Sequence, residues 1–461
     1  MVSLSHWRRA LNQHLLLEPL VQEVLSHENI EACCRQAGHR WRETFWSPVT
    51  TVLTFLLQVL SAEKTLRAAV SSLLAQLNTQ GQNVVCSSDP SAYCQARRRL
   101  PGQVVESLNG NLAEQMTALV GPEGRWHGHP VKIVDGSCVS MPDTPELQKV
   151  FPQPEAQKPG CGFPVARLVA LFDWASGAIL RLAIGNLLVS ELALFRKNRP
   201  EWLPPNDVLV ADRYYCAYGD LVQLQRQGVF VIFRQHQRRK TDFRKGQRLG
   251  PDDQLVTWRR PGQWIPSCGL TREEFEALPE QLTIRQIRIT EVPKGFRSRI
   301  IVVVTTLLDP VRYPAEEIRA LFRDRWMAEL NLRSLKTHLG MDVLHGENPD
   351  VVGKEILLHL LAYNLIRLLM WRAARRYAKN LHRLSFTGTL HRLRRMMSFG
   401  VEGRRSRTIL YETLLQWIAN DEVPYRPNRL EPRRKKRRPK EYSLLNKPRS
   451  WYRRHGDPDV R

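Results

Sequence analysis

The stretch VARLVALFDWASGAILRLAIGN, residues 165–186, contains two apolar runs joined by the turn-forming segment WASG. The runs VARLVALFD (165–173) and AILRLAIGN (178–186) have the length and the aliphatic content of buried strands. Two such runs separated by a short turn containing glycine predict a β-hairpin. The rest of the fold has to be compatible with this hairpin.

Strand-like and helical patterns alternate on either side of the hairpin. Alternation of this kind favours an α/β fold, with a mixed sheet and helices packed on its faces. The order of three strands, helix, strand, helix and strand matches the ribonuclease H-like fold, an analogy that concerns the fold and not the chemistry. The further elements are a strand in HPVKIVDGSCVSM (129–141), a helix over 190–198, a strand over 206–215, a helix over 219–228 and a strand over 229–235.

The regions outside this core differ in composition. Residues 1–125 predict an all-helical domain, which either binds DNA or is a packed domain with solvated arginines. Residues 236–296 are rich in Arg, Lys and Gln and predict a β-rich insertion; the strand over 299–307 belongs either to it or to the main sheet. Long helices extend to about residue 395. The end of the chain, 426–461, has 14 Lys and Arg against 4 Asp and Glu, which predicts a disordered or loosely docked arm.

Charge limits the classes of partner. The 461 residues carry a net charge of +24, and the pI is near 10.1. This excess favours a polyanionic partner, with nucleic acid first and an anionic membrane second. A membrane is disfavoured because the most apolar run, ILLHLLAYNLIRLLMW (356–371), contains His359, Asn364 and Arg367 and predicts a buried helix. The N-terminus has no pattern of a signal peptide.

Cysteine and histidine give little indication of a metal site. The eight cysteines are scattered without CxxC spacing and predict reduced, intracellular thiols. His127 and His129 form an HxH beside a glycine-rich turn, which is a weak candidate for metal binding.

Three carboxylates are better candidates for catalysis. Asp135 lies in the first predicted strand, Asp212 ends the fourth, and Glu329 lies on a later helix. In a ribonuclease H-like sheet the first and fourth strands are neighbours, so the two aspartates would lie side by side at one edge of the sheet. Three clustered carboxylates repel one another, and Mg²⁺ removes that cost because it prefers oxygen ligands and shares itself with phosphate oxygens. Taken singly, VDGS also fits a turn and ADR also fits a helix cap.

The helix that carries Glu329 adds cations on the same side. In RDRWMAELNLRSLK (323–336), Arg325 and Lys336 fall with Glu329 in a stripe roughly 60° wide, and Arg333 borders it. Two interpretations stay open at this point. The acid and its cations form ordinary salt bridges, or the acid binds a metal ion while the cations hold phosphates.

Three blocks together resemble a bacterial insertion-sequence transposase of the DDE type, of the IS-four family. They begin at VDGSCVSM (134–141), VLVADRYYCAYGDL (208–221) and FRDRWMAELNLRSLK (322–336), and the resemblance covers most of residues 45–375. It implies that Asp135, Asp212 and Glu329 bind two Mg²⁺ or Mn²⁺ ions. It also implies a ribonuclease H-like catalytic domain over 126–375 and a helical C-terminal region over 376–425.

The family motif of the third block is Tyr-x2-Arg-x3-Glu-x6-Lys, and its positions hold Phe322, Arg325, Glu329 and Lys336. The resemblance implies that these cations hold DNA near the cleavage site. Phe322 departs from the motif, since a phenyl ring cannot donate a hydrogen bond to phosphate. The insertion of this family is thought to stabilise a DNA hairpin by trapping a flipped base on a tryptophan. Trp258 is the candidate and Trp264 the alternative, although either also fits a small packed sheet.

The function that the resemblance implies is cut-and-paste transposition: hydrolysis at the element ends, hairpin formation and resolution, and strand transfer. Expected partners are double-stranded DNA at the terminal inverted repeats and at the target, bound by a homodimer, with no membrane. The expected location is the bacterial cytoplasm, associated with the nucleoid. Two other functions stay open, namely a ribonuclease H-like nuclease without strand transfer and an inactive, transposase-derived DNA-binding protein.

Overall fold

The computed structural model describes most of the chain. The described ranges are 24–79, 86–291, 299–397, 404–424 and 445–455. Parts of the predicted helical N-terminal domain and most of the predicted basic tail lie outside the described residues, namely 1–23, 80–85, 425–444 and 456–461.

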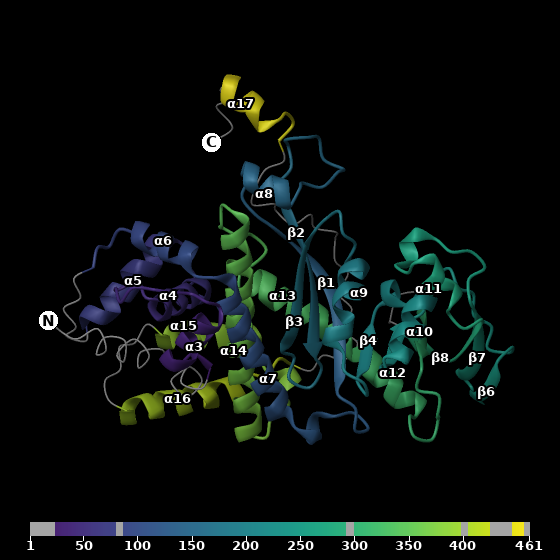
Figure 1. Cartoon of the computed structure of the whole chain (residues 1–461). Helices are drawn as coiled ribbons and strands as arrows, with labels where there is room; N and C mark the ends of the chain where they lie inside the picture. Colours follow the sequence, from purple (N-terminus) through teal and green to yellow (C-terminus); the bar gives the residue numbers. More distant parts are fainter. Residues whose placement is uncertain (1–23, 80–85, 292–298, 398–403, 425–444, 456–461) are drawn as a thin grey trace.

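The described residues contain one large mixed sheet with the strand order β3-β2-β1-β4-β5-β9-β8-β7-β6 (Figure 1). β4 lies parallel to both of its neighbours, β1 and β5, and the other neighbouring strands are antiparallel. The first and fourth strands are therefore neighbours, as the sequence predicts. The strands are β1 (Val131–Ser140), β2 (Val165–Asp173), β3 (Ile179–Asn186), β4 (Val208–Ala211), β5 (Phe230–Arg234), β6 (Gln247–Gly250), β7 (Asp253–Arg259), β8 (Gln281–Glu291) and β9 (Arg299–Thr305).

The predicted hairpin is formed by β2 and β3, and a buried helix, α14 (Pro349–Arg376), holds its turn. Tyr363 donates a hydrogen bond from its hydroxyl to the carbonyl of Gly177 (2.7 Å), and Arg367 donates from Nε to the carbonyl of Ser176 (2.9 Å). Asn364 both donates to and accepts from the backbone of Ile179, at 2.9 Å each. The polar residues of the apolar run 356–371 thus satisfy backbone groups that the hairpin turn would otherwise leave unpaired in the core.

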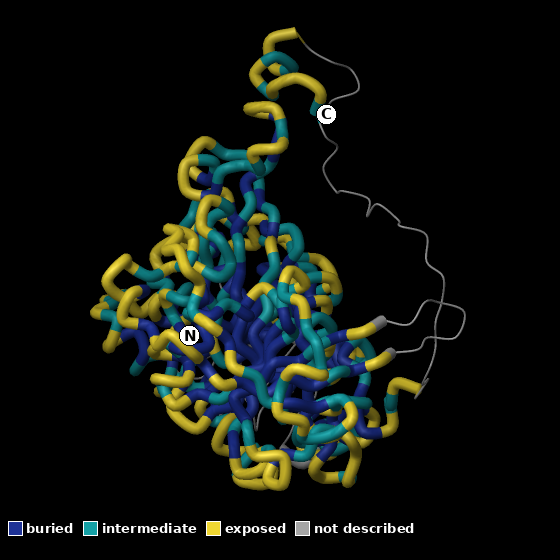
Figure 2. Tube along the Cα trace, turned by 90° about the vertical axis from the view of Figure 1, so that its right-hand side faces the viewer, coloured by how far each residue is buried: buried dark blue, intermediate teal, exposed yellow. Residues whose placement is uncertain are grey.

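α14 is long and apolar enough to cross a membrane by composition, but 83% of its most apolar window is buried inside the protein. The prediction of a buried core helix is confirmed. α14 lies between the sheet and the N-terminal helices, and the buried part of the chain is concentrated at the centre of the molecule (Figures 1 and 2).

The two faces of the sheet belong to different apolar clusters. Ile133 and Val210 pack on the face covered by α12, α13 and α14, whereas Val134 and Leu209 pack on the face covered by α9 and α10. This alternation follows from the two-residue period of a strand. The covering helices are α9 (Glu191–Trp202), α10 (Tyr218–Arg226), α12 (Ala315–Asp324) and α13 (Trp326–Arg333).

The helices near the N-terminus share the core of the sheet. Leu53 and Leu108 belong to the same buried cluster as Leu361 of α14, so the described helices before residue 125 pack into the rest of the molecule. The division into domains at about residue 125 stays a prediction. These helices are α3 (His27–Gln36), α4 (Pro48–Leu60), α5 (Leu66–Thr79), α6 (Ser91–Arg99) and α7 (Gly102–Val120); the short α8 (Pro145–Val150), and α15 (Phe386–Met397) and α16 (Arg404–Ala419), complete the packed body.

The β-rich insertion continues the main sheet. β9 pairs with β5 on one side and with β8 on the other, so the strand that the sequence leaves unassigned joins the two parts. β6, β7 and β8 then extend the sheet as antiparallel strands, and α11 (Arg272–Glu276) lies between β7 and β8 in the chain.

A short helix, α17 (Arg449–His455), is the described part of the basic tail, and it lies next to α8 at one end of the molecule (Figure 1). Arg449 anchors it by a salt bridge to Asp143 (3.0 Å) and by stacking over Phe163 (4.1 Å). This segment of the predicted arm is therefore helical and docked.

Candidate active site

Asp135 and Asp212 lie at matching positions of neighbouring parallel strands. The pairing of β1 with β4 matches Ile133 with Val210, and continuing this register by two residues brings Asp135 opposite Asp212. Asp135 continues the alternation within β1 that places Ile133 on the face of α13, and Asp212 directly follows the last residue of β4.

Arg234 extends this row by one strand. β4 pairs with β5 so that Ala211 matches Phe233, and the next residues along are Asp212 and Arg234. The Nη1 of Arg234 lies 3.9 Å from Oδ1 of Asp212, and this Oδ1 atom is buried and accepts no hydrogen bond. A buried carboxylate oxygen without a donor is available to a cation. Arg234 is not among the sequence candidates, and its position at the end of a strand beside a predicted catalytic strand was the available signal.

Glu329 comes from the helix that covers this face. α12 ends at Asp324, Arg325 forms the junction, and α13 carries Glu329 against β1. The Nη2 of Arg325 donates to Oε1 of Glu329 at 2.9 Å. The first of the two interpretations of this stripe, an ordinary salt bridge between the acid and a cation, thus describes the observed contact.

The expected single helical stripe is interrupted after Arg333. Residues Ser334–His338 form one π-helical turn, and Lys336 lies within it. Lys336 is close enough to Cys138 of β1 to oppose the rise in the pKa of that thiol that burial causes.

The electrostatic environment disfavours negative charge on Asp135. Burial raises the pKa of its carboxyl group to about 6, and the nearby carboxylates of Glu191 and Glu329 add to this rise. A hydrogen bond from the backbone N–H of Gly136 (2.9 Å) and the charge of Arg325 act in the opposite direction. A bound cation would remove the repulsion between these acids.

The donor set fits a divalent ion in chemistry and in placement on one face. Asp135, Asp212 and Glu329 supply only carboxylate oxygens, the ligands that Mg²⁺ and Mn²⁺ prefer. Among the described residues, no three His, Cys, Asp or Glu side chains converge tightly enough to enclose one ion.

Glu191 is a second residue that the sequence candidates omit. It begins α9 on the opposite face of the sheet, and its Oε1 accepts a hydrogen bond from the buried hydroxyl of Tyr215 (2.6 Å). Its carboxylate lies directly over Gly136, where a Cβ atom would be 2.1 Å from Cδ of Glu191. Gly136 thus admits a carboxylate beside the strand that carries Asp135.

Gly136→Ala is expected to lower the free energy of unfolding by about 1–3 kcal/mol. The new methyl group displaces the carboxylate of Glu191 and leaves the buried hydroxyl of Tyr215 without an acceptor. Chemical denaturation measures the loss. Gly353→Ala in α14 is the matched control, because nothing lies within 4 Å of a Cβ there. Equal stability of Gly136→Ala and the parent would contradict the close contact.

The DNA-contact candidates fall into exposed and buried groups. Arg333 is exposed, and Arg325 and Lys336 are half-buried. Phe322 is only 6% exposed and packs in the larger apolar cluster. Trp258 is 7% exposed and lies under the guanidinium of Arg239, 3.9 Å from the ring centroid, so a base cannot reach its ring without displacing Arg239.

Trp264, the alternative to Trp258, is more accessible at 38% exposure, and its Nε1 donates to the carbonyl of Leu270 (2.9 Å). Which tryptophan contacts DNA stays a prediction.

The two histidines of the HxH segment are engaged in other contacts. His127 bonds through Nε2 to Glu317 (2.5 Å), while His129 bonds to the carbonyl of Asn206 (2.9 Å) and to the hydroxyl of Tyr313 (2.8 Å). These partners give both rings a structural role that joins β1 to the start of α12.

Comparison with known proteins adds an independent line of evidence. Residues 126–365 match a family model described as the transposase DDE domain. Over 366 residues, the chain is 27% identical to transposase InsG for insertion sequence element IS4 of Escherichia coli (strain K12), which corresponds to 78% of this chain and 79% of that protein. Among solved structures, the piggyBac transposase in a cryo-EM synaptic complex with hairpin DNA aligns with 91% of this chain and 85% of its own, at 8% identity and a TM-score of 0.39, which is too low to assign a fold.

Proposed function

The chain belongs to the DDE transposase family, in its IS4 type, whose members cleave DNA and transfer strands, and from this premise we propose that it moves an insertion sequence by a cut-and-paste reaction. In this reaction the enzyme hydrolyses the DNA at both element ends, forms and resolves a hairpin at each end, and joins the freed ends to target DNA. The observation that carries the proposal is the parallel pairing of β1 with β4, whose register, continued by two residues, matches Asp135 with Asp212, while the helix of Glu329 packs against β1.

The proposed catalytic domain is a ribonuclease H-like core over 126–375. The order β3-β2-β1-β4-β5, with an antiparallel β1-β2-β3 part followed by parallel β4 and β5, supports this assignment. The insertion at about 236–296 lies between the second aspartate and Glu329 in the chain. The helical segment 1–125 is the proposed binding domain for transposon ends, with 376–425 as a helical C-terminal region and 426–461 as a basic tail.

Asp135, Asp212 and Glu329 are the proposed ligands of two divalent ions, Mg²⁺ or Mn²⁺. Such ions activate the attacking oxygen and stabilise the leaving oxygen in phosphodiester cleavage. The protein contributes three carboxylates: Asp135 within β1, Asp212 directly after β4, and Glu329 on α13. Arg325 and Arg234 are placed to release their acids and to contact phosphate instead, since a guanidinium binds a carboxylate and a phosphate with the same donors.

The proposed DNA contacts surround this edge. Arg325, Arg333 and Lys336 supply positive charge along one helical segment, which is suited to the strand near the cleavage site. Phe322 packs beneath them and supports the helix. Trp258, or Trp264 in its place, is the proposed stacking partner of a base flipped out at the hairpin. The partners are the terminal inverted repeats and the target DNA, bound by a homodimer.

Joining of a pre-cut element end to plasmid DNA tests the proposed function. The purified full-length protein is incubated with a labelled end fragment, supercoiled plasmid and Mg²⁺. We expect labelled fragment to become covalently attached to the plasmid, with none formed in EDTA. Cleavage of uncut ends without any joined product would instead identify a nuclease, and would contradict strand transfer.

A further inference from the structure

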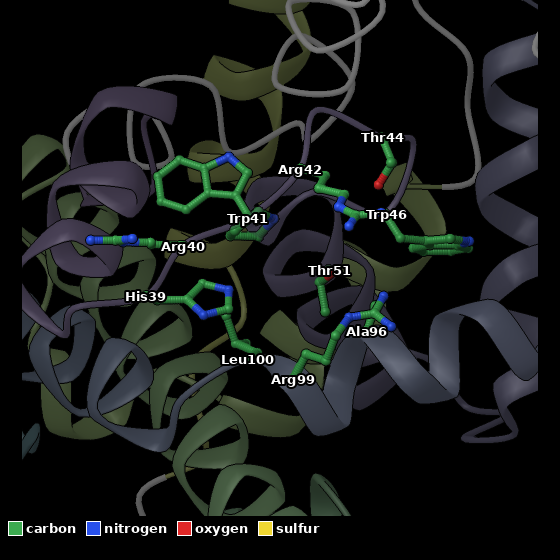
Figure 3. A pocket seen from close by; sticks show the side chains of 11 residues that line it. His39, Arg40, Trp41, Arg42, Thr44, Trp46, Thr51, Ala96, Arg99 and Leu100 are labelled. Atoms are coloured by element: carbon green, nitrogen blue, oxygen red, sulfur yellow. The ribbon is translucent and has the colours of Figure 1, made fainter.

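A pocket of about 400 Å³ lies among the N-terminal helices, on the other side of α14 from the sheet (Figures 1 and 3). We call it the arginine pocket. It is formed where the segment between α3 and α4 meets the first turn of α4 and the end of α6. Its lining includes two tryptophans and three arginines, the residues on which the argument depends: Trp41, Trp46, Arg40, Arg42 and Arg99.

The three arginines make the lining of the pocket positively charged. The lining contains no Asp or Glu, and among the described residues no carboxylate forms an ion pair with Arg40, Arg42 or Arg99. Burial lowers the pKa of His39 in the same pocket, and the charge of Arg99 lowers it further. Like charges that share one concave site repel one another, so an anion bound there would be stabilised by all three.

The backbone just before Arg99 is anchored to the body of the protein. The buried Nζ of Lys354 on α14 pairs with Asp350 (2.6 Å) and donates to the carbonyls of Arg97 (3.0 Å) and Arg98 (3.1 Å). These bonds hold the last turn of α6 against α14, so the backbone that presents Arg99 to the pocket is fixed.

The aromatic residues add a surface for a planar group. Trp41 stacks on His39 with ring centroids 6.0 Å apart, and Trp46 is fixed against buried Tyr93 at 4.9 Å. Tryptophan faces bind nucleobases of any sequence, and arginine binds the phosphodiester beside them. The volume lies within the range of about 300–1,000 Å³ that small-ligand sites occupy, so the pocket accommodates one nucleotide and not a stacked duplex.

We propose that the arginine pocket binds one unpaired nucleotide of a DNA strand, with its phosphate among Arg40, Arg42 and Arg99 and its base against Trp41. An unpaired nucleotide occurs at a frayed or cut strand end, or where a base leaves the stack. The pocket would thus distinguish opened DNA from intact duplex, separately from the acids at the sheet edge.

Binding of a labelled single-stranded thymidine oligonucleotide to the full-length protein, measured without divalent metal, tests this proposal. We expect the double variant Arg42→Ala/Arg99→Ala to bind at least about tenfold more weakly, as loss of two charge-assisted contacts implies. The slope of log affinity against log salt should flatten by about 0.7, since the pocket holds one phosphate and each phosphate neutralised on a single strand contributes about 0.7. The matched control is Arg67→Ala/Arg98→Ala, which removes the same charge from exposed positions outside the pocket lining.

A crosslinking arm locates the base. An oligonucleotide with one 5-iododeoxyuridine is irradiated, and the modified peptide is identified by mass spectrometry. A crosslink on Trp41 supports the proposal, and its absence overturns it. Equal losses in the two double variants would also overturn it, because they would indicate a general basic surface. Competition by polyglutamate at the concentration of the oligonucleotide would overturn the assignment to DNA, because it would show that any polyanion fills the site.

Neither arm requires cleavage, so these outcomes are independent of whether Asp135, Asp212 and Glu329 are the catalytic acids.

Discussion

Asp135→Asn is expected to lower the rate of end cleavage at least about a thousandfold, while binding of element-end DNA changes by less than about twofold. Loss of a metal ligand removes several kcal/mol of transition-state stabilisation, and each 1.4 kcal/mol is a factor of about ten. Binding of DNA is spread over many basic contacts and does not depend on one acid. Asp212→Asn and Glu329→Gln should behave in the same way.

Two measurements distinguish this loss from unfolding. Mn²⁺ should raise the thermal stability of the parent and not of these variants, because an ion stabilises only a state that binds it. Asp309→Asn is the matched control, since Asp309 is exposed and caps a turn away from the sheet edge. Parental cleavage by Glu329→Gln would show that the third acid is assigned wrongly.

Asp135→Asn should also stabilise the metal-free protein in a defined pH range. Burial raises the pKa of Asp135 to about 6, above its value in the unfolded chain, which is about 3.9. The unfolded chain therefore loses this proton first as pH rises, and the native state loses stability between about pH 4 and pH 6. Asparagine does not titrate in this range. The gain in the free energy of unfolding of Asp135→Asn over the parent should therefore be absent below about pH 4 and complete above about pH 6.

Arg285→Met is expected to lower the free energy of unfolding by about 3–5 kcal/mol, because it leaves a buried carboxylate without its partner. Arg285 is 0% exposed and donates to Asp253 through Nε (2.8 Å) and Nη2 (2.5 Å). Its Nη1 also donates to the carbonyl of Tyr313 (2.7 Å), just before α12. The bond connects the inserted strands to the helix that leads to Glu329, so the variant should lose activity as well.

Two further variants in the insertion test whether burial of the charge causes this loss of stability. Arg285→Met combined with Asp253→Leu should recover most of the stability, since it removes both charges from the core. Arg244→Met breaks a solvent-exposed pair with Asp242 in the same region and should cost far less stability than Arg285→Met, because water screens both charges. Chemical denaturation of the four proteins measures these differences. Equal losses for Arg285→Met and Arg244→Met would contradict the effect of burial.

Local patterns in the sequence predicted the elements that carry the candidate acids. Short stretches of sequence are enough to show the spacing of apolar residues that is typical of each element. This holds for the hairpin at 165–186, for the strands that carry or precede Asp135 and Asp212, and for the helix of Glu329. The neighbouring position of the first and fourth strands followed from the order of elements. The shared face of the acids was predictable because side chains alternate along every strand.

Contacts between residues that are distant in the chain decided which side chains are buried. Residues 236–296 look like solvated polar sequence, yet Arg285 is buried because Asp253, 32 positions earlier, lies beside it on the next strand. Phe322 lies on the predicted stripe, but the packing of α12 turns it into the core. Glu191 reaches Gly136 only because α9 crosses the sheet there.

The sequence by itself thus determined the order of strands and helices, which is encoded in residue type and short-range period, and it predicted three carboxylates as the candidate acids. Only the tertiary structure decided which charges are buried and paired, where the helix near Glu329 breaks into a π turn, and that three arginines converge on one pocket. The physical reason is that the cost of burying a charge depends on the groups around it, and these come from segments that the chain brings together only on folding.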